Sequence, residues 1–172
     1  MKYYFLLILT SIVFINSFAQ KKLSFSLCGV YNRTQYDITK SQNAFGIGIG
    51  GKINYRLSAF LSLDIEGSGS FFGGTKETII INGQVLHSKN GIKSIYTGIQ
   101  YPIIFPIRMS SQYGFHTIAG ERNHGVRQAI LVALSKKERF FLRASFDHVF
   151  QSNPLKKGDW GFWGYSFVAR LF

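Results

Sequence analysis

Hydrophobic and polar residues alternate along most of the chain beyond residue 21. Between residues 45 and 57, the odd positions are Phe45, Ile47, Ile49, Gly51, Ile53, Tyr55 and Leu57, and the even positions are Gly46, Gly48, Gly50, Lys52, Asn54 and Arg56. Successive side chains of a β-strand point to opposite faces. The stretch therefore predicts a strand with one oily face and one small or polar face. A helix would scatter the isoleucines and would be weakened by the alternating glycines.

The same alternation recurs with turn signals between the segments. The predicted strands cover about residues 22–31, 44–57, 60–72, 92–105, 111–119, 126–135, 139–150 and 160–171. Links after the second, fourth and sixth strands are short, a short loop at 120–125 follows the fifth, and the other links are longer. Short turns at one end and longer loops at the other are typical of outer-membrane barrels. We therefore expect an all-β fold, an eight-stranded antiparallel up-and-down transmembrane β-barrel.

A soluble, lipocalin-like barrel would show the same alternation with the oily face inside. Two features favour lipid on the outside. The polar face is rich in small residues, such as Gly48, Ser68 and Ser70, which suit the narrow lumen of eight strands. Aromatic residues, including Tyr31 and Trp163, gather near strand ends, where both membrane interfaces call for them.

The amino-terminal sequence predicts that the protein is exported from the cytoplasm. Lys2 precedes an apolar run at residues 3–15, and Asn16-Ser17-Phe18-Ala19 supplies a small-x-small cleavage site. This is the pattern of a secretory signal peptide. We expect a signal peptide at 1–19, a barrel domain at 20–172 and an outer-membrane location.

Composition agrees with a membrane surface as the environment. The chain carries 20 Lys and Arg against 8 Asp and Glu, a formal net charge of +12. In a secreted chain this charge points away from nucleic acid and toward anionic lipid headgroups or other acidic surfaces. We expect outer-membrane lipid and lipopolysaccharide as partners. The four histidines fall in different elements without metal-ligand spacing, so neither a metal nor a cofactor is expected.

Charged residues on the predicted inner face form the first candidate site. They are Lys52, Arg56, Asp64, Glu66, Lys93, Arg143, Asp147 and Arg170. Buried charges need partners, so we expect an ion-pair network that plugs the lumen. The alternative is a narrow anion-preferring pore, which the small interior volume disfavours.

A predicted hairpin beyond the third strand forms the second candidate site. Asn-Gly between apolar arms is the strongest short hairpin signal. The hairpin comprises Ile79, Ile80, Ile81, Asn82, Gly83, Val85 and Leu86. We expect the third and fourth strands to continue into it, and its apolar patch to add a strand to a partner protein of the envelope.

Two stretches resemble known families of barrels. The segment Ile99-Gln-Tyr-Pro-Ile-Ile-Phe105 is similar to a strand of the PorT-like outer-membrane barrels of Bacteroidota, although Gln100 stands where that family usually has a carboxylate. The terminal strand 163–172 resembles the signal that the barrel insertion machinery reads. The first resemblance implies an eight-stranded barrel and, from the type member, assistance to a protein-secretion system.

A third resemblance concerns catalysis. An outward His148 close to Ser152-Asn153 is similar to the arrangement in lipid A deacylases, whose base, nucleophile and acidic orienter would be His148, Ser152 and Asp159 here. Four positions separate His148 from Ser152, about 13 Å in an ideal strand. We therefore expect a non-enzymatic, monomeric barrel that serves as structure, adhesion point or accessory to an envelope or secretion complex. A lipid A deacylase-like hydrolase is the alternative.

Overall fold

Ten strands make up the computed structural model of the chain, which describes residues 22–35, 44–73, 79–81, 84–86, 90–118, 121–150 and 159–172. The strands are β1 (Leu23–Thr34), β2 (Phe45–Arg56), β3 (Ser62–Gly73), β4 (Ile79–Ile81), β5 (Gln84–Leu86), β6 (Asn90–Ile104), β7 (Ile107–Ile118), β8 (Glu121–Ala133), β9 (Phe140–Phe150) and β10 (Trp160–Arg170). The predicted signal peptide lies outside the described residues. No helix among the described residues is long and apolar enough to cross a membrane.

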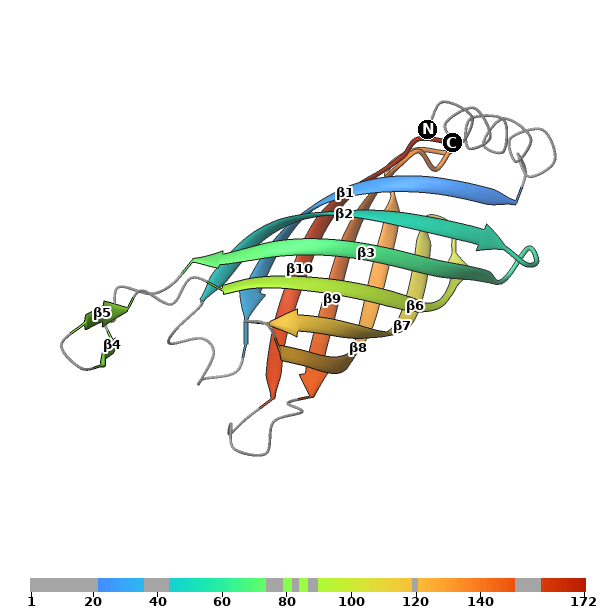
Figure 1. Cartoon of the computed structure of the whole chain (residues 1–172). Coiled ribbons are helices and arrows are strands. Elements are labelled where there is room, and N and C mark those ends of the chain that lie inside the picture. Colours follow the sequence, from blue (N-terminus) through green and yellow to red (C-terminus); the bar gives the residue numbers. More distant parts are fainter. Residues whose placement is uncertain are drawn as a thin grey trace, which may run out of the picture.

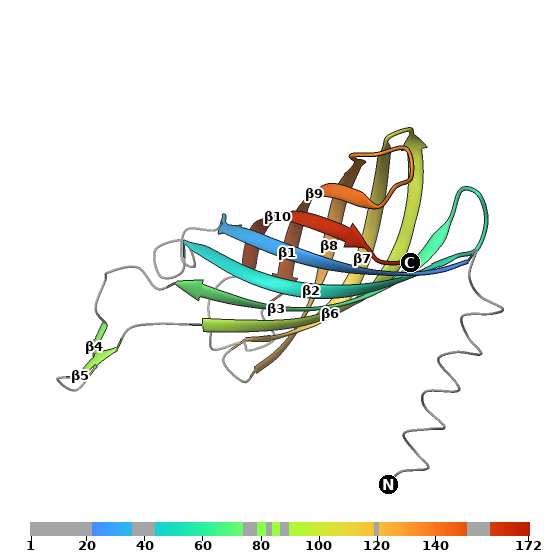
Figure 2. The same cartoon turned by 90° about the horizontal axis from the view of Figure 1, so that it is seen from above.

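Eight of these strands close into a barrel, in the order β1-β10-β9-β8-β7-β6-β3-β2, with every neighbouring pair antiparallel. The predicted fold class is therefore confirmed. Residues 57–61, 105–106 and 134–139 link strands at one end, which we call the turn end. The other four links lie at the opposite end, the loop end. Figures 1 and 2 show the C-terminus at the turn end and β4 and β5 beyond the loop end.

The oily face of the sheet points outward. Exposed fractions reach 77% at Ile49 and 76% at Phe71, whereas Asp64, Glu66 and Asp147 on the other face are 0% exposed. A water-soluble barrel would reverse this arrangement. The outer surface therefore matches a lipid environment, which is the orientation that the small residues of the polar face predicted.

Glycine on the inner face makes room where side chains cross the lumen. A Cβ atom on Gly114 would lie 2.4 Å from the backbone oxygen of Ile95 and 2.6 Å from Cδ1 of Tyr96. A Cβ atom on Gly48 would lie 2.5 Å from the backbone oxygen of Gly69. Such distances are impossible for real atoms, so these positions need glycine because of close approach.

The structure differs from the expected boundaries in three places, the first being β1, which continues to Thr34 rather than ending at residue 31. The turn after β6 is confined to Phe105 and Pro106, so β7 begins at Ile107 rather than residue 111. β8 begins at Glu121, which makes the predicted loop at 120–125 wrong, because those polar residues pair with β7 as far as Ile118. Polar residues near a strand end resemble a loop when only composition is considered.

The hairpin forms, but as a sheet of its own. Ile79 pairs with Leu86 and Ile81 with Gln84 across the predicted Asn82-Gly83 turn, which itself lies outside the described residues. β4 and β5 pair only with each other, so they do not continue β3 and β6 as expected. Because of this break, the register between β3 and β6 in the barrel does not depend on the register between β4 and β5 in the hairpin. Gln100 therefore pairs with Ser62 and points inward, 2% exposed.

Candidate functional site

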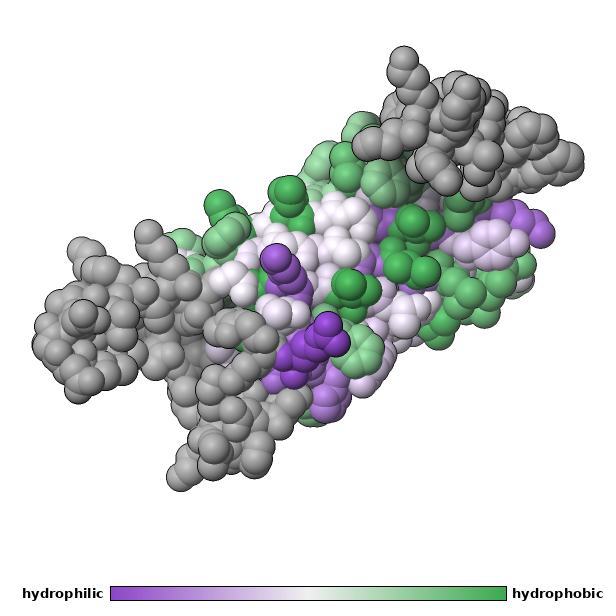
Figure 3. Space-filling model, in the orientation of Figure 1, coloured by the Kyte–Doolittle hydropathy of each residue, from purple (hydrophilic) through white to green (hydrophobic). Residues whose placement is uncertain are grey.

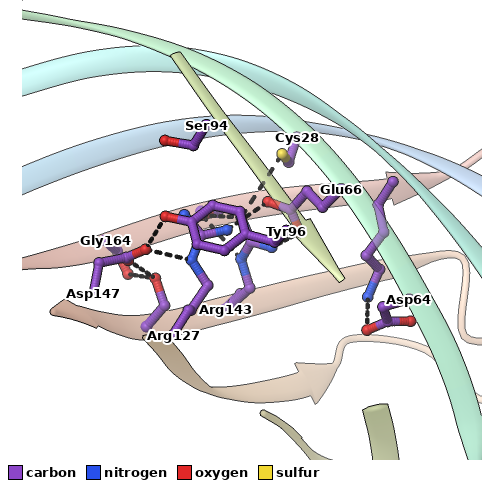
Figure 4. A network of polar contacts seen from close by, with 12 residues as sticks. Cys28, Asp64, Glu66, Ser94, Tyr96, Arg127, Arg143, Asp147 and Gly164 are labelled. Atoms are coloured by element: carbon purple, nitrogen blue, oxygen red, sulfur yellow. Dashed lines mark hydrogen bonds and ion pairs between the residues drawn. The ribbon is translucent and has the colours of Figure 1, made fainter. Parts of the chain in front are cut away.

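The centre of the lumen holds a carboxylate between two guanidinium groups. Glu66 on β3 accepts hydrogen bonds from Arg127 on β8 at 2.8 Å (Oε1 to Nη1) and from Arg143 on β9 at 2.5 Å (Oε2 to Nη1). All three side chains are at most 5% exposed. Figure 4 shows Glu66 and the two arginines turned toward one another. Because each Glu66 oxygen has its own cation, the carboxylate is fully engaged.

Asp147 on β9 extends this cluster on the far side of Arg127. Its Oδ1 accepts a hydrogen bond from Nε of Arg127 at 2.7 Å and another from the hydroxyl of Tyr96 on β6. The guanidinium of Arg127 lies 3.7 Å from the centre of the Tyr96 ring, a cation–π contact. The hydroxyl of Ser145 donates to Oδ2 at 3.3 Å. Arg127 is therefore the hub that joins both carboxylates.

A second cluster lies nearer the turn end. The ammonium of Lys52 on β2 lies 3.3 Å from Oδ2 of Asp64 on β3 and 2.7 Å from Oε1 of Gln100 on β6. The amide of Asn54 donates to the other oxygen of Asp64 at 2.5 Å. Gln100 thus accepts from the lysine at a position where the PorT-like pattern has a carboxylate.

Charge in the described part of the lumen is balanced. The buried cations are Lys52, Arg127 and Arg143, and the buried carboxylates are Asp64, Glu66 and Asp147. Three positive and three negative groups leave no net charge. Balance of this kind is required because an unpaired ion loses its hydration without compensation.

The two ion pairs of Glu66 cross the lumen, whereas the Lys52–Asp64 and Arg127–Asp147 pairs join neighbouring strands. β3 and β9 are four places apart in either direction around the eight strands, so they face each other across the lumen. The Glu66–Arg143 pair therefore bridges the full diameter, and the Glu66–Arg127 pair bridges β3 to β8. Side chains that meet in the middle occupy the space that a water column would need.

Apolar side chains close the lumen at the loop end. Phe72, Ile92, Ile118, Val149 and Phe162 form a buried cluster there, each at most 6% exposed. Below it, Nδ1 of His116 lies 2.9 Å from the hydroxyl of Ser94. A second apolar cluster on β1, β8, β9 and β10 includes Leu131 and Phe141. The described interior is therefore filled by an apolar lid above a charge network.

Comparisons with known proteins agree with this geometry. Neither a protein-family model nor a curated protein sequence matches the chain. Among solved structures, the outer-membrane protein Ail of Yersinia pestis in a phospholipid nanodisc has a TM-score of 0.58 at 12% identity, over 86% of this chain and 99% of Ail. The chain has the fold of a small outer-membrane barrel.

Two further structures of transmembrane barrels share this fold. Neisserial surface protein A has a TM-score of 0.55 at 11% identity, over 86% of this chain and 96% of its own. A de novo designed transmembrane β-barrel has a TM-score of 0.52 at 11% identity, over 86% and 95%. At such low identity the likeness concerns the fold alone.

Three of the eight predicted lumen charges lie outside the buried network: Lys93 is on the outer face, whereas Arg56 and Arg170 are on the inner face at the turn end. Arg56 is the last residue of β2 and is exposed. Lys93 is exposed on the outer face, because its position has the same parity as the outward Ile95. Arg170 ends β10 at the turn end, where its Nη1 lies 3.5 Å from Glu138. The lumen network therefore contains Lys52, Asp64, Glu66, Arg143 and Asp147 of the predicted set.

Arg127 is the network residue that the sequence analysis missed. The alternation would have found it, since Val126 and Ile130 face outward and the residue after Val126 must face inward.

A separate ion-pair cluster braces the turn end. Glu138 accepts two hydrogen bonds from Nη2 of Arg108, at 2.8 and 2.7 Å. Partial burial acts to raise the pKa of Glu138, but the hydrogen bonds and positive charge of Arg108, together with the charge of Arg170, outweigh it and lower that pKa below its usual value. Glu138 therefore remains ionised at neutral pH.

The structure brings together two of the three residues of the hydrolase alternative. Nε2 of His148 lies 3.1 Å from Oδ2 of Asp159, close enough for a hydrogen bond. The His148 ring also packs edge-on against Phe150 at 4.5 Å between ring centres. Ser152 lies outside the described residues.

Two other expectations concern the rest of the molecule. The side chains of the predicted partner hairpin lie outside the described part of the structure, so its contact role stays a prediction. Among the described residues, no group of three or more His, Cys, Asp or Glu side chains could hold a metal ion.

Proposed function

We propose that the chain is a non-enzymatic outer-membrane protein whose barrel is closed to solutes and serves as a rigid platform for structure, adhesion or an envelope complex. The observation that carries this proposal is the Glu66–Arg143 pair, which spans the lumen from β3 to the opposite strand β9. A barrel braced across its diameter offers its outer wall and its loops for contact, rather than its interior.

The outer wall and the amino terminus support an outer-membrane address. Exposed side chains on the barrel exterior are mainly Ile, Leu, Phe and Tyr. Such a surface is stable in hydrocarbon and would aggregate in water. Together with the signal peptide predicted at 1–19, it favours export followed by membrane insertion. The PorT-like segment 99–105 is consistent with an accessory role in secretion.

The closed lumen makes a direct prediction for electrical recording. Purified protein inserted into planar lipid bilayers will give no steady ion conductance, because paired charges and an apolar lid fill the interior. Insertion is verified in the same preparation by protease protection and by a heat-dependent gel shift. Stepwise anion-selective currents from folded, inserted protein would contradict the proposal and establish the narrow pore instead.

The contact between His148 and Asp159 favours one second candidate, a lipid A acyl hydrolase. In that mechanism Asp159 would orient His148 as the base for a serine nucleophile. Our proposal predicts that lipid A from cells that express the wild-type chain or the Ser152→Ala variant will have identical acylation in mass spectra. Loss of an acyl chain with the wild-type protein alone would establish the hydrolase.

A further inference from the structure

One side of the outer wall is hollowed where lipid-facing strands usually carry bulky side chains. Three adjoining hollows of about 940, 770 and 650 Å³ are centred on β3 and extend over β1, β2 and β10 on one side and over β6, β7 and β8 on the other. Gly69 lines all three. We call this region the glycine hollow. Its outer-face glycines are Gly29, Gly51, Gly67, Gly69 and Gly91.

The glycine hollow is open space rather than close packing. A Cβ atom added to Gly29, Gly67 or Gly69 would meet nothing within 4 Å. These glycines therefore differ from those of the inner face, where a Cβ atom collides with the neighbouring strand. Figure 3 shows a pale area over these strands, bounded by strongly hydrophobic side chains. The barrel itself does not require glycine at these places.

Two cations stand side by side at the edge of this hollow. In the sheet register Gly69 pairs with Lys93, Lys93 with Thr117, and Thr117 with Arg122. Neighbouring strands are about 4.8 Å apart, so two strand spacings of about 10 Å separate the Lys93 and Arg122 backbones. Lys93, Thr117 and Arg122 all line the largest hollow. A single phosphate above Thr117 is within reach of both cations.

None of the carboxylates whose side chains the structure describes lies beside Lys93 and Arg122. Those carboxylates lie in the lumen (Asp64, Glu66 and Asp147), at the turn end (Glu138) or against His148 (Asp159). Both cations lie within four residues of the loop-end limits of their strands. They are therefore positioned for the outer leaflet's anionic headgroups, with the hollow beside them at acyl-chain depth.

We propose that the glycine hollow is a docking site for lipid A, in which Lys93 and Arg122 bind a phosphate and an acyl chain lies along Gly69. This inference rests on the outer-membrane location in the proposed function. Arginine and lysine both form charge-assisted hydrogen bonds to phosphate oxygens. In a bilayer all apolar surfaces are already surrounded by lipid, so the hydrophobic effect does not favour one site for the acyl chain over another. The binding free energy of the acyl chain therefore comes from its close packing in the hollow.

The test is native mass spectrometry of the full chain in detergent, titrated with diphosphoryl lipid A. Removing both cations by Lys93→Gln and Arg122→Gln will weaken binding about 30-fold. Gly69→Leu will also weaken it, because the leucine occupies the hollow while leaving both charges in place. Either variant binding like the wild type would overturn the proposal.

Matched controls separate this site from general charge or bulk. Lys136→Gln with Lys137→Gln removes two exposed cations at the turn end, and Thr97→Leu adds bulk to the outer face away from the hollow. Both controls will bind lipid A like the wild type, and weakened binding in either would overturn the proposal.

Competing lipids identify the occupant. Dephosphorylated lipid A and phosphatidylglycerol will each bind more weakly than diphosphoryl lipid A. If dephosphorylated lipid A bound equally well, the phosphate site would be refuted. If phosphatidylglycerol bound equally well, lipid A would be refuted as the specific occupant. Cell fractionation of the wild-type chain distinguishes these failures from a failure of the proposed function, since an outer-membrane protein without lipid A selectivity would refute only the docking site.

Discussion

Replacing Glu66 by glutamine will destabilise the barrel by about 3–5 kcal/mol, because it leaves two buried guanidinium groups without their shared carboxylate. Arg127 retains Asp147, but among the described residues Arg143 retains the hydroxyl of Ser166 and the sulfur of Cys28, neither of which is charged at neutral pH. The measurement is the free energy of unfolding in urea, with the protein folded into lipid vesicles and followed by tryptophan fluorescence.

The matched control for this change is Glu138→Gln. Glu138 also contacts two arginines, Arg108 and Arg170, but its side chain is 21% exposed and lies at a turn. Solvent screening limits such a pair to about 1 kcal/mol or less. A loss at Glu66 no larger than that at Glu138 would show that the central network does not hold the barrel together.

The second large effect is expected from glycine on the inner face. Gly114→Val will largely abolish folding, since its Cβ atom would lie 2.4 Å from the backbone oxygen of Ile95 and the strands would have to separate. The measurement is the fraction of protein that shows the heat-dependent gel shift of a folded barrel after refolding into vesicles.

Gly67→Val is the control, because it makes the same chemical change on the outer face. A Cβ atom there meets nothing within 4 Å, so we expect folding equal to or better than that of the wild type. Both variants restrict the unfolded chain to the same degree, so that contribution cancels in the comparison. Equal folding of the two variants would contradict the close approach between β6 and β7.

The fold could be predicted from the sequence because the alternation of hydrophobic and polar residues within each strand is enough to identify its two faces. The glycines at 46, 48 and 50 pointed correctly to a cramped lumen. Lys93 was misassigned even though its parity with Ile95 places it outside. Arg127 was missed, although its place after the outward Val126 puts it on the inner face. The polar residues from 121 to 125 resembled a loop, because their pairing with β7 cannot be read from composition.

Which charges meet could not be predicted from alternation. Parity gives the face of a residue, whereas its height in the barrel depends on the register of every strand between it and its partner. Glu66 and Arg143 are 77 residues apart, and three strands separate them in either direction around the wall. The glycine hollow has the same origin, since Gly69, Lys93 and Arg122 become neighbours only through the register of four strands.

The bridge across the barrel has a consequence for assembly. Until β1 meets β10, the chain is an open sheet, and the partners on β3 and β9 are held at distant places along it. The Lys52–Asp64 and Arg127–Asp147 pairs join neighbouring strands and can form in the open sheet. Glu66 and Arg143 find each other only when the last seam forms, and until then each needs water as its partner. Closure of the barrel wall and formation of the central ion pair should therefore occur together at the final step of insertion.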